Sequence, residues 1–181
     1  MVRLASLLLV ACALVACTRT PTAQADESDC AGGDGPACAR RLERMKESCK
    51  EKNVKACIDT ADAYGTPLHA PKDDAQAAIY YEAACDLGDG RSCALLADQR
   101  FAGRGVARDV TRALVLDERA CTLGYAAGCK ELADCLERGD AFRGCRDKDL
   151  RKAHDLWARY CELEKTPSCE QLKRVEKALT P

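Results

Sequence analysis

Cysteines are the residues of this chain most able to form covalent or metal bonds, and there are 14 of them. Four pairs, each eight positions apart, recur along the chain: Cys49 and Cys57, Cys85 and Cys93, Cys121 and Cys129, and Cys161 and Cys169. Such pairs predict either disulfide bridges or thiolate ligands of a metal ion. Zinc sites favour spacings of two to four residues, often with histidine. His69 and His154 lie away from the pairs, so bridges are favoured and we expect no metal and no cofactor.

Two further cysteine pairs depart from this recurring pattern. Cys30 and Cys38 share the spacing of eight, but Cys38 lies only 11 positions before Cys49. A bridge there would tie the N-terminal segment to the first helix. Cys135 and Cys145 fall in a unit with four extra residues, where a bridge would hold the longer loop against its helix. The sequence therefore predicts six bridges.

An internal repeat explains the recurrence of the cysteines. The first cysteine of each recurring pair advances by 36, 36 and then 40 residues. Alanine, leucine and aspartate columns advance with it: Ala77, Ala113 and Ala153; Leu96, Leu132 and Leu172; Asp73, Asp109 and Asp149. A fixed period of this length is typical of solenoids built from one supersecondary unit. We expect repeat units at about 36–65, 73–105, 109–145 and 149–179 within a domain of residues 30–181.

Each unit has the pattern of two helices joined by a turn. Asp109 precedes an uninterrupted helical stretch and is a suitable N-cap, while Gly124 provides the left-handed residue that ends many helices. The first cysteine of a pair then ends the first helix, and the second cysteine begins the second helix. A bridge would lock the hairpin and contribute roughly 2–3 kcal/mol. The predicted fold class is all-α, an α/α-hairpin solenoid stapled by disulfides.

The last unit carries charge where the earlier units carry small residues. The column of Ala61, Ala97 and Ala133 continues as Lys173, and the neighbouring aspartate column continues as Arg174. A charged outer face is typical of the terminal repeat of a stack, because no further repeat covers it.

The N-terminus has the pattern of an export signal. Arg3 is followed by apolar or small residues at 4–16 and then by Cys17, a run too short to span a bilayer comfortably. The ending Leu14-Val15-Ala16-Cys17 resembles a bacterial lipoprotein signal, in which the cysteine is lipidated and becomes the mature N-terminus. A secretory signal cut nearby is the alternative. Cys12 has similar preceding residues, but cleavage there would leave an apolar tail.

The compartment and the partners follow from this interpretation. Residues 17–29 would form a flexible tether from the lipidated Cys17, and the protein would lie in the bacterial cell envelope. By analogy with lipoprotein sorting, Thr18 favours the outer membrane, with the domain in the periplasm or at the surface. The membrane would be contacted through the lipid anchor only. A formal net charge of −1 provides no basic face for nucleic acid. We expect a monomer.

Several segments of the second unit resemble the Sel-one-like repeat family of α/α hairpins, a relative of the tetratricopeptide repeats. They are Tyr81–Cys85, Gly88–Gly90, Ser92-Cys93, Leu96 and Gly103–Asp109. The resemblance covers about residues 36–179, and the cysteine pairs are most similar to those of cysteine-rich secreted Helicobacter members. It implies a scaffold that binds a protein or peptide in a concave groove. The alternative that it implies is a β-lactam-interacting protein or weak β-lactamase.

The residues favour binding over hydrolysis of β-lactams. Serine β-lactamases use a Ser-x-x-Lys element. None of the serines beyond the signal segment has lysine three positions later: Ser28, Ser48, Ser92 and Ser168. Two histidines cannot supply the cluster of a zinc hydrolase. We therefore predict no catalytic residue.

The first helix of each hairpin should line a groove if the family pattern holds. The predicted contact residues are Tyr81, Glu82, Asp117, Arg119, His154, Trp157 and Arg159. Two alternatives stay open for members of this set. Tyr81 and Trp157 could fill gaps between helices, and His154 could be an ordinary exposed helix residue. Arg119 and Arg159 share a column, which could bind an anionic ligand or simply face solvent.

Overall fold

The computed structural model describes residues 23–66, 71–166 and 169–180, and these residues form helices joined by turns and loops. Within those ranges there is no β-strand, so the prediction of an all-α fold is confirmed. The elements in chain order are α1 (Ala23–Ala31), α2 (Gly35–Lys50), α3 (Val54–Gly65), α4 (Asp74–Asp86), α5 (Gly90–Ala102), α6 (Val110–Thr122), α7 (Ala126–Arg138), the short 3-10 helix η1 (Ala141–Arg143), α8 (Leu150–Leu163) and α9 (Glu170–Leu179).

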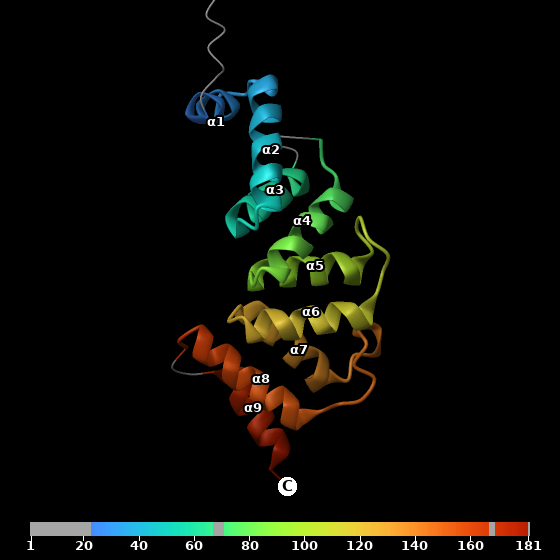
Figure 1. The fold of residues 1–181 in the computed structure, drawn as a ribbon. Helices are drawn as coiled ribbons and strands as arrows, with labels where there is room; N and C mark the ends of the chain where they lie inside the picture. The colour runs from blue at the N-terminus through green and yellow to red at the C-terminus, as the bar shows by residue number, and fades with distance from the viewer. Residues whose placement is uncertain (1–22, 67–70, 167–168, 181) are drawn as a thin grey trace, which may run out of the picture.

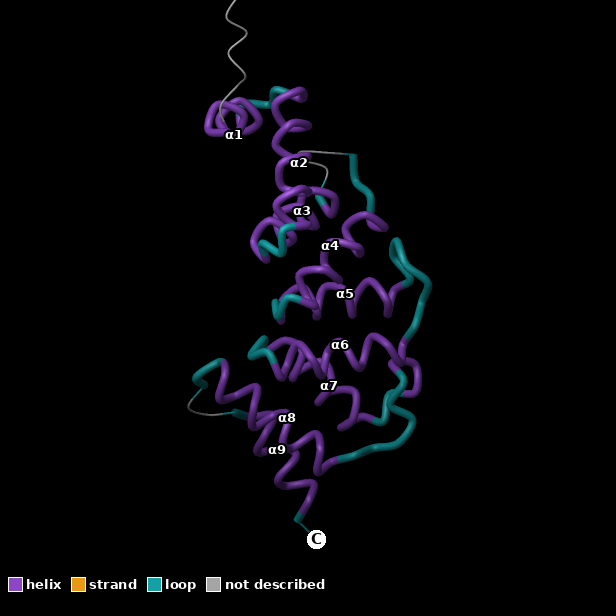
Figure 2. The backbone as a smooth tube through the Cα atoms, viewed as in Figure 1, coloured by secondary structure: helices purple, strands orange, loops and turns teal. Residues whose placement is uncertain are grey.

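Successive helices stack in chain order from α1 at one end to α9 at the other (Figure 1). Each helix packs mainly against its neighbours in sequence, as expected for a solenoid. The short turns α4–α5 and α6–α7 lie along one edge of the stack, and the longer α5–α6 and α7–α8 connections lie along the other (Figure 2). The helix pairs α2–α3, α4–α5, α6–α7 and α8–α9 extend over residues 35–65, 74–102, 110–138 and 150–179.

Aspartate N-caps set the starts of the first helices of the units. The carboxylates of Asp73, Asp109 and Asp149 accept hydrogen bonds from backbone amides of the first turns of α4, α6 and α8. These bonds satisfy amides that have no partner within the helix. Gly124 has φ +85° and follows α6, as predicted.

Small residues allow the helices to approach closely. Ala77, Ala113 and Ala153 are each no more than 3% exposed. At Gly128 of α7, an added Cβ would lie 2.5 Å from the carbonyl oxygen of Asp117 in α6. That distance is too short for any side chain, so glycine is required where α7 crosses α6. The alanine columns therefore mark contacts between helices.

The six predicted cysteine pairs are joined as disulfides. Four hairpin bridges of the predicted spacing, together with Cys30–Cys38, connect consecutive helices. Cys135–Cys145 holds η1 and the longer loop against α7. The Cα–Cα distances range from 4.6 Å for Cys30–Cys38 to 6.0 Å for Cys161–Cys169, which a disulfide can span.

The segment before Cys30 differs from the predicted tether. Residues 17–22 lie outside the described residues, but residues 23–29 belong to helix α1. The side chain of Asp26 is 1% exposed and pairs with Arg40 and Arg44 of α2. These ion pairs and the Cys30–Cys38 bridge hold α1 against α2. The prediction was wrong here because α1 is fixed by polar contacts, which leave no apolar period in the sequence.

The charged positions of the last unit have two different environments. Lys173 is exposed, as expected for the end of the stack. Arg174 instead donates from Nε and Nη2 to the two carboxylate oxygens of Glu137 on α7, at 2.6 and 2.7 Å. A two-pronged pair of this kind joins α9 to the preceding unit.

Candidate partner-binding site

Tyr81 and Trp157, two predicted contact residues, are buried in the stack. Trp157 is 1% and Tyr81 8% exposed. Tyr81 packs in the cluster that joins α3 to α6, whereas Trp157 packs with Ala133 and Val175 near the C-terminal end. Filling gaps between helices is therefore the interpretation that the structure supports for both, and they offer little surface to a partner.

The polar atoms of both aromatic side chains have partners within the protein. The hydroxyl of Tyr81 donates to Oδ1 of Asp62 at 2.6 Å, and Arg91 donates to Oδ2 of the same carboxylate at 3.2 Å. Burial, with this acceptor, raises the pKa of Tyr81 far above its usual range. Nε1 of Trp157 donates to Glu137 at 3.0 Å. These bonds join consecutive units of the stack.

Three charged or titratable members of the predicted set, Arg119, Arg159 and His154, lie beside carboxylates near the surface. Arg119 donates to Oδ1 of Asp86 on α4 at 2.9 Å, which links neighbouring units. Arg159 pairs with Glu162 on its own helix at 2.7 Å. Nδ1 of His154 lies 3.2 Å from Oδ1 of Asp155. Glu82 is half-buried. The structure does not bring the seven predicted residues together into one pocket, and the role of these exposed members stays a prediction.

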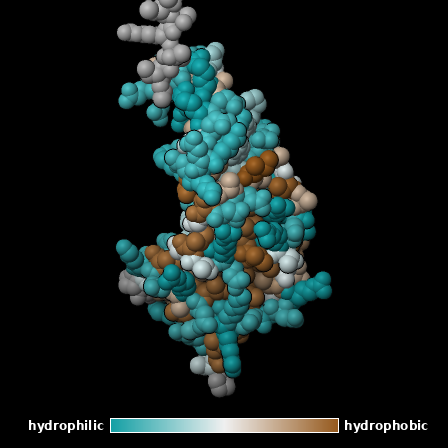
Figure 3. All heavy atoms as spheres, viewed as in Figure 1, coloured by the Kyte–Doolittle hydropathy of each residue, from teal (hydrophilic) through white to brown (hydrophobic). Residues whose placement is uncertain are grey.

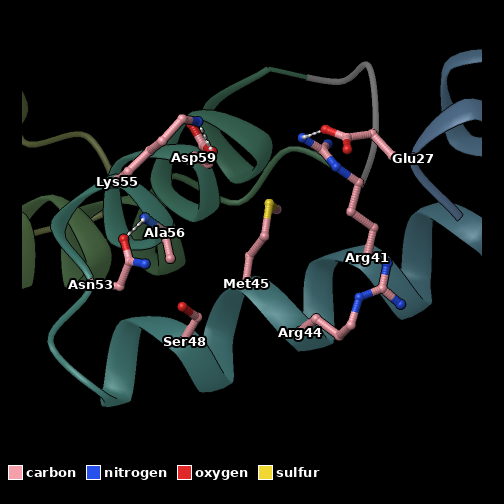
Figure 4. Close-up of a pocket in the computed structure, with 9 residues that line it drawn as sticks. All are labelled: Glu27, Arg41, Arg44, Met45, Ser48, Asn53, Lys55, Ala56 and Asp59. Carbon is pink, nitrogen blue, oxygen red and sulfur yellow. Dashed lines mark hydrogen bonds and ion pairs between the residues drawn. The ribbon is translucent and has the colours of Figure 1, made fainter. Parts of the chain in front are cut away.

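A cavity of about 260 Å³ lies between α1, α2 and α3 (Figure 4). Its charged lining includes Glu27 of α1, Arg41 and Arg44 of α2, and Lys55 and Asp59 of α3. Lys55 pairs with Asp59, and Arg41 lies 3.9 Å from Glu27. Met45 projects between these groups (Figure 4). A polar segment carrying both charge signs could bind here by exchanging ion pairs.

Sequence reasoning did not identify this cavity. Arg44 contributes to it, yet its guanidinium also pairs with Asp26. The hydrogen bond from Arg40 is the main reason why the pKa of Asp26 lies below its usual range. The only signal in the sequence was the high density of basic residues on α2. That density could not indicate a site without α1, which forms one side of the cavity and was not predicted as a helix.

The remaining predicted residue, Asp117, lines a second cavity. It is 6% exposed and lies with Asp98 of α5 and Glu131 of α7 around a space of about 100 Å³. Asp98 belongs to the aspartate column of the repeat that continues as Arg174, together with Asp62 and Asp134. Glu131 had no recognisable signal in the sequence. The arrangement provides negative charge in a partly apolar setting.

Hydrophilic and hydrophobic side chains are unevenly distributed over one face of the stack (Figure 3). Figure 3 shows hydrophilic side chains over most of the visible face around α1–α3, and hydrophobic ones gathered lower in the stack. None of the helices in the described ranges has the length and apolar character needed to cross a bilayer. Cys17, the predicted lipidation site, lies outside the described residues.

Solved structures of other proteins share this fold. A Sel1 repeat protein from Oxalobacter formigenes is 23% identical, with a TM-score of 0.60, over 76% of this chain and 98% of that protein. A protective antigen of uropathogenic Escherichia coli with an SLR fold is 21% identical, with a TM-score of 0.61, over 87% of this chain but only 38% of that one. Helicobacter pylori cysteine rich protein B is 26% identical, with a TM-score of 0.49, over 60% of this chain and 90% of that protein. No curated protein matches the chain.

The family model of the Sel1 repeat matches three consecutive segments, residues 54–89, 90–125 and 126–164. Each matched segment begins with the second helix of one predicted unit and extends through the first helix of the next. The matched region covers more than half of the sequence, and the predicted resemblance is confirmed: the chain belongs to the Sel1 repeat family.

Proposed function

We propose that this protein is an exported scaffold, lipid-anchored in the bacterial cell envelope, that binds a protein or peptide partner. Sel1 repeats generally mediate binding between proteins. The observation that carries the proposal is the pre-ordered stack itself. Bridges lock α1 to α2 and the two helices of each hairpin, and packing joins each hairpin to the next. Little conformational freedom therefore remains to be lost when a partner binds.

The disulfides and the N-terminal sequence support export. Six bridges in one chain are typical of an oxidising compartment, because thiols stay reduced in most cytosols. The apolar run 4–16 followed by Cys17 provides both the signal and the acceptor of a lipid. Mass spectrometry of the mature N-terminus should find a diacylglyceryl group on Cys17, and an unmodified peptide beginning elsewhere would contradict the anchor.

The cavity between α1, α2 and α3 is where we place a first contact with the partner. Its volume of about 260 Å³ exceeds the roughly 100 Å³ of the cavity beside Asp117, and charged groups of both signs line it. Its ion pairs are at the surface, where each contributes little stability. A partner segment can therefore replace these pairs at small cost, and it gains specificity from the alternation of charge.

Capture of partners from envelope extract tests the proposal. The oxidised protein should retain a specific protein, and Lys55→Glu should reduce the retained amount several-fold by reversing one charge of the cavity. Lys50→Glu is the matched control, because Lys50 pairs with Glu47 and does not line the cavity. Equal capture by both variants would overturn the assigned contact. Failure of the oxidised protein to retain any protein would overturn the scaffold function.

A further inference from the structure

The cavity between α5, α6 and α7 combines apolar walls with carboxylates. Ala94, Leu95 and Tyr125 contribute apolar surface, and Asp98, Asp117 and Glu131 contribute the charge. No basic side chain lines this space. Its volume of about 100 Å³ corresponds to roughly three water molecules at about 30 Å³ each. The end of one long side chain would fill a space of this size.

Asp117 is the buried member of the three carboxylates. It is 6% exposed, and its carboxylate makes no hydrogen bond or ion pair with any residue that the structure describes. A buried charge without a partner is costly, and native proteins normally pair it. Burial, and next the nearby Asp98, raise the pKa of Asp117 to about 7. The charge of Arg143, which pairs with Glu131, opposes this rise, but among the described residues no basic side chain pairs with Asp117 directly.

The other two carboxylates differ in their surroundings. Glu131 is held by Arg143 Nη1 at 2.7 Å and by Lys130 at 3.3 Å. Arg143 is also packed 4.9 Å from the ring centre of Phe101, so it is occupied outside the cavity. Asp98 is exposed and lies at the solvent side. Partial desolvation of the Asp98 carboxyl beside the cavity, followed by the charge of Glu131, raises the pKa of Asp98, and Arg104 and Arg143 oppose that rise.

We propose that this cavity receives a basic side chain, lysine or arginine, of the bound partner. The inference rests on the proposed scaffold function and adds the chemistry that the partner must present. The cationic group would pair with Asp117 below and Asp98 at the mouth. Its methylene groups would contact the apolar walls, as the stems of long basic side chains do elsewhere. The ring of Tyr125 provides a further favourable surface for a cation.

The arrangement favours an organic cation over a metal ion. Among the residues that the structure describes, no three histidine, cysteine or carboxylate side chains are grouped as metal ligands would be. Two sources could supply the organic cation: a side chain of a partner protein or a free diamine. The apolar and acidic lining suits either source, so the experiment separates them.

Binding of small probes to the oxidised protein, followed by amide NMR shifts, tests the proposal. The probes are acetyl-Ala-Lys-Ala-amide, acetyl-Ala-Arg-Ala-amide, acetyl-Ala-Gln-Ala-amide, 1,4-diaminobutane and Mg²⁺. We expect a basic peptide to shift residues of α5, α6 and α7, and the glutamine peptide to shift none. Stronger binding of the diamine than of both basic peptides would overturn the assignment to a partner side chain. Mg²⁺ that displaces the peptides would overturn the assignment to an organic cation.

Two variants and a matched control locate the binding. Asp117→Asn should weaken peptide binding about tenfold, the effect of removing one charged partner, and Asp98→Asn should weaken it by less. Asp147→Asn changes the net charge equally but lies in the exposed loop after Cys145, so binding should be unchanged. Equal weakening by Asp147→Asn, or none by Asp117→Asn in a protein with unchanged helicity, would overturn the proposal.

The outcomes also separate this inference from the scaffold function. If the oxidised protein captures a partner and Asp117→Asn captures it equally, the cavity assignment fails and the scaffold function stands. If the probes bind at Asp117 but envelope extract provides no partner, the scaffold function fails and the cation site stands.

Discussion

Two regions of the stack bury an aspartate side chain and treat its charge in opposite ways. At the N-terminal end, Asp26 of α1 accepts hydrogen bonds from Arg40 and Arg44, and its pKa is lowered, mainly by the bond from Arg40. In the middle of the stack, Asp117 has no such bond and its pKa rises to about 7. The paired aspartate attaches a helix, whereas the unpaired one lines a cavity. The buried carboxylate of Asp26 therefore has a structural role, whereas we propose that the buried carboxylate of Asp117 serves binding.

Reduction of the disulfides should have the largest effect, and it tests what the two regions share. Each bridge contributes roughly 2–3 kcal/mol, so loss of all six removes about 12–18 kcal/mol if the contributions add. That loss is comparable to a whole unfolding free energy, typically about 5–15 kcal/mol. We expect the reduced chain to lose most of its helical circular dichroism at room temperature. A reduced chain that melts cooperatively near the oxidised temperature would show that packing alone holds the stack.

The pH dependence of Asp117→Asn should be the next largest effect. The folded state binds the Asp117 proton more tightly than the unfolded chain, so Asp117 makes stability fall as pH rises from about 4 to about 7. The size of this fall is on the order of 2–4 kcal/mol. Denaturant unfolding at pH 5 and pH 8 should show that the asparagine variant loses this decline while Asp147→Asn keeps it. Parallel pH curves for all three proteins would contradict an unpaired Asp117.

Asp26→Asn should change the pH dependence of stability in the opposite direction, and its effect should be confined to the N-terminal end of the stack. The lowered pKa means that Asp26 stabilises the fold above its unfolded pKa and that this contribution is lost as pH falls through the folded value. At neutral pH the variant should expose the amides of α1 to hydrogen exchange while those of α5 to α7 stay protected. Glu27→Gln is the control, because Glu27 is exposed and its carboxylate makes only a long contact, 3.9 Å, with the guanidinium of Arg41. Unchanged protection of α1 would contradict the role of the buried pair.

The smallest expected effect belongs to the exposed pairs between units. Arg119→Ala removes the ion pair with Asp86. The side chains of Arg119 and Asp86 are both exposed to solvent. Solvent screens such pairs, so the unfolding free energy should fall by less than about 1 kcal/mol. A loss above that value in thermal unfolding would mean that surface pairs, and not the bridges and alanine columns, determine the stacking.

The sequence predicted those features that short-range chemistry determines. The cysteine spacing predicted the disulfide pairing, and the aspartates before α4, α6 and α8 predicted where those helices begin. Disulfide pairing and helix capping could be predicted because each depends on residues only a few positions apart. Helix α1 was missed because it is held by the Asp26 pairs with α2, which leave no hydrophobic period. Asp117 was predicted as a contact residue of a groove, and its burial could not be predicted without the packing of α5 and α7 around α6.

The pKa of Asp117 in the free and ligand-bound protein tests most directly whether its buried charge is kept for a partner. Carboxyl carbon shifts of Asp117, followed against pH, measure it with and without acetyl-Ala-Lys-Ala-amide. We predict a pKa near 7 in the free protein and a lower value with the peptide, because a bound cation favours the ionised carboxylate. A pKa near 4 in the free protein, or one that saturating peptide leaves unchanged, would contradict the account.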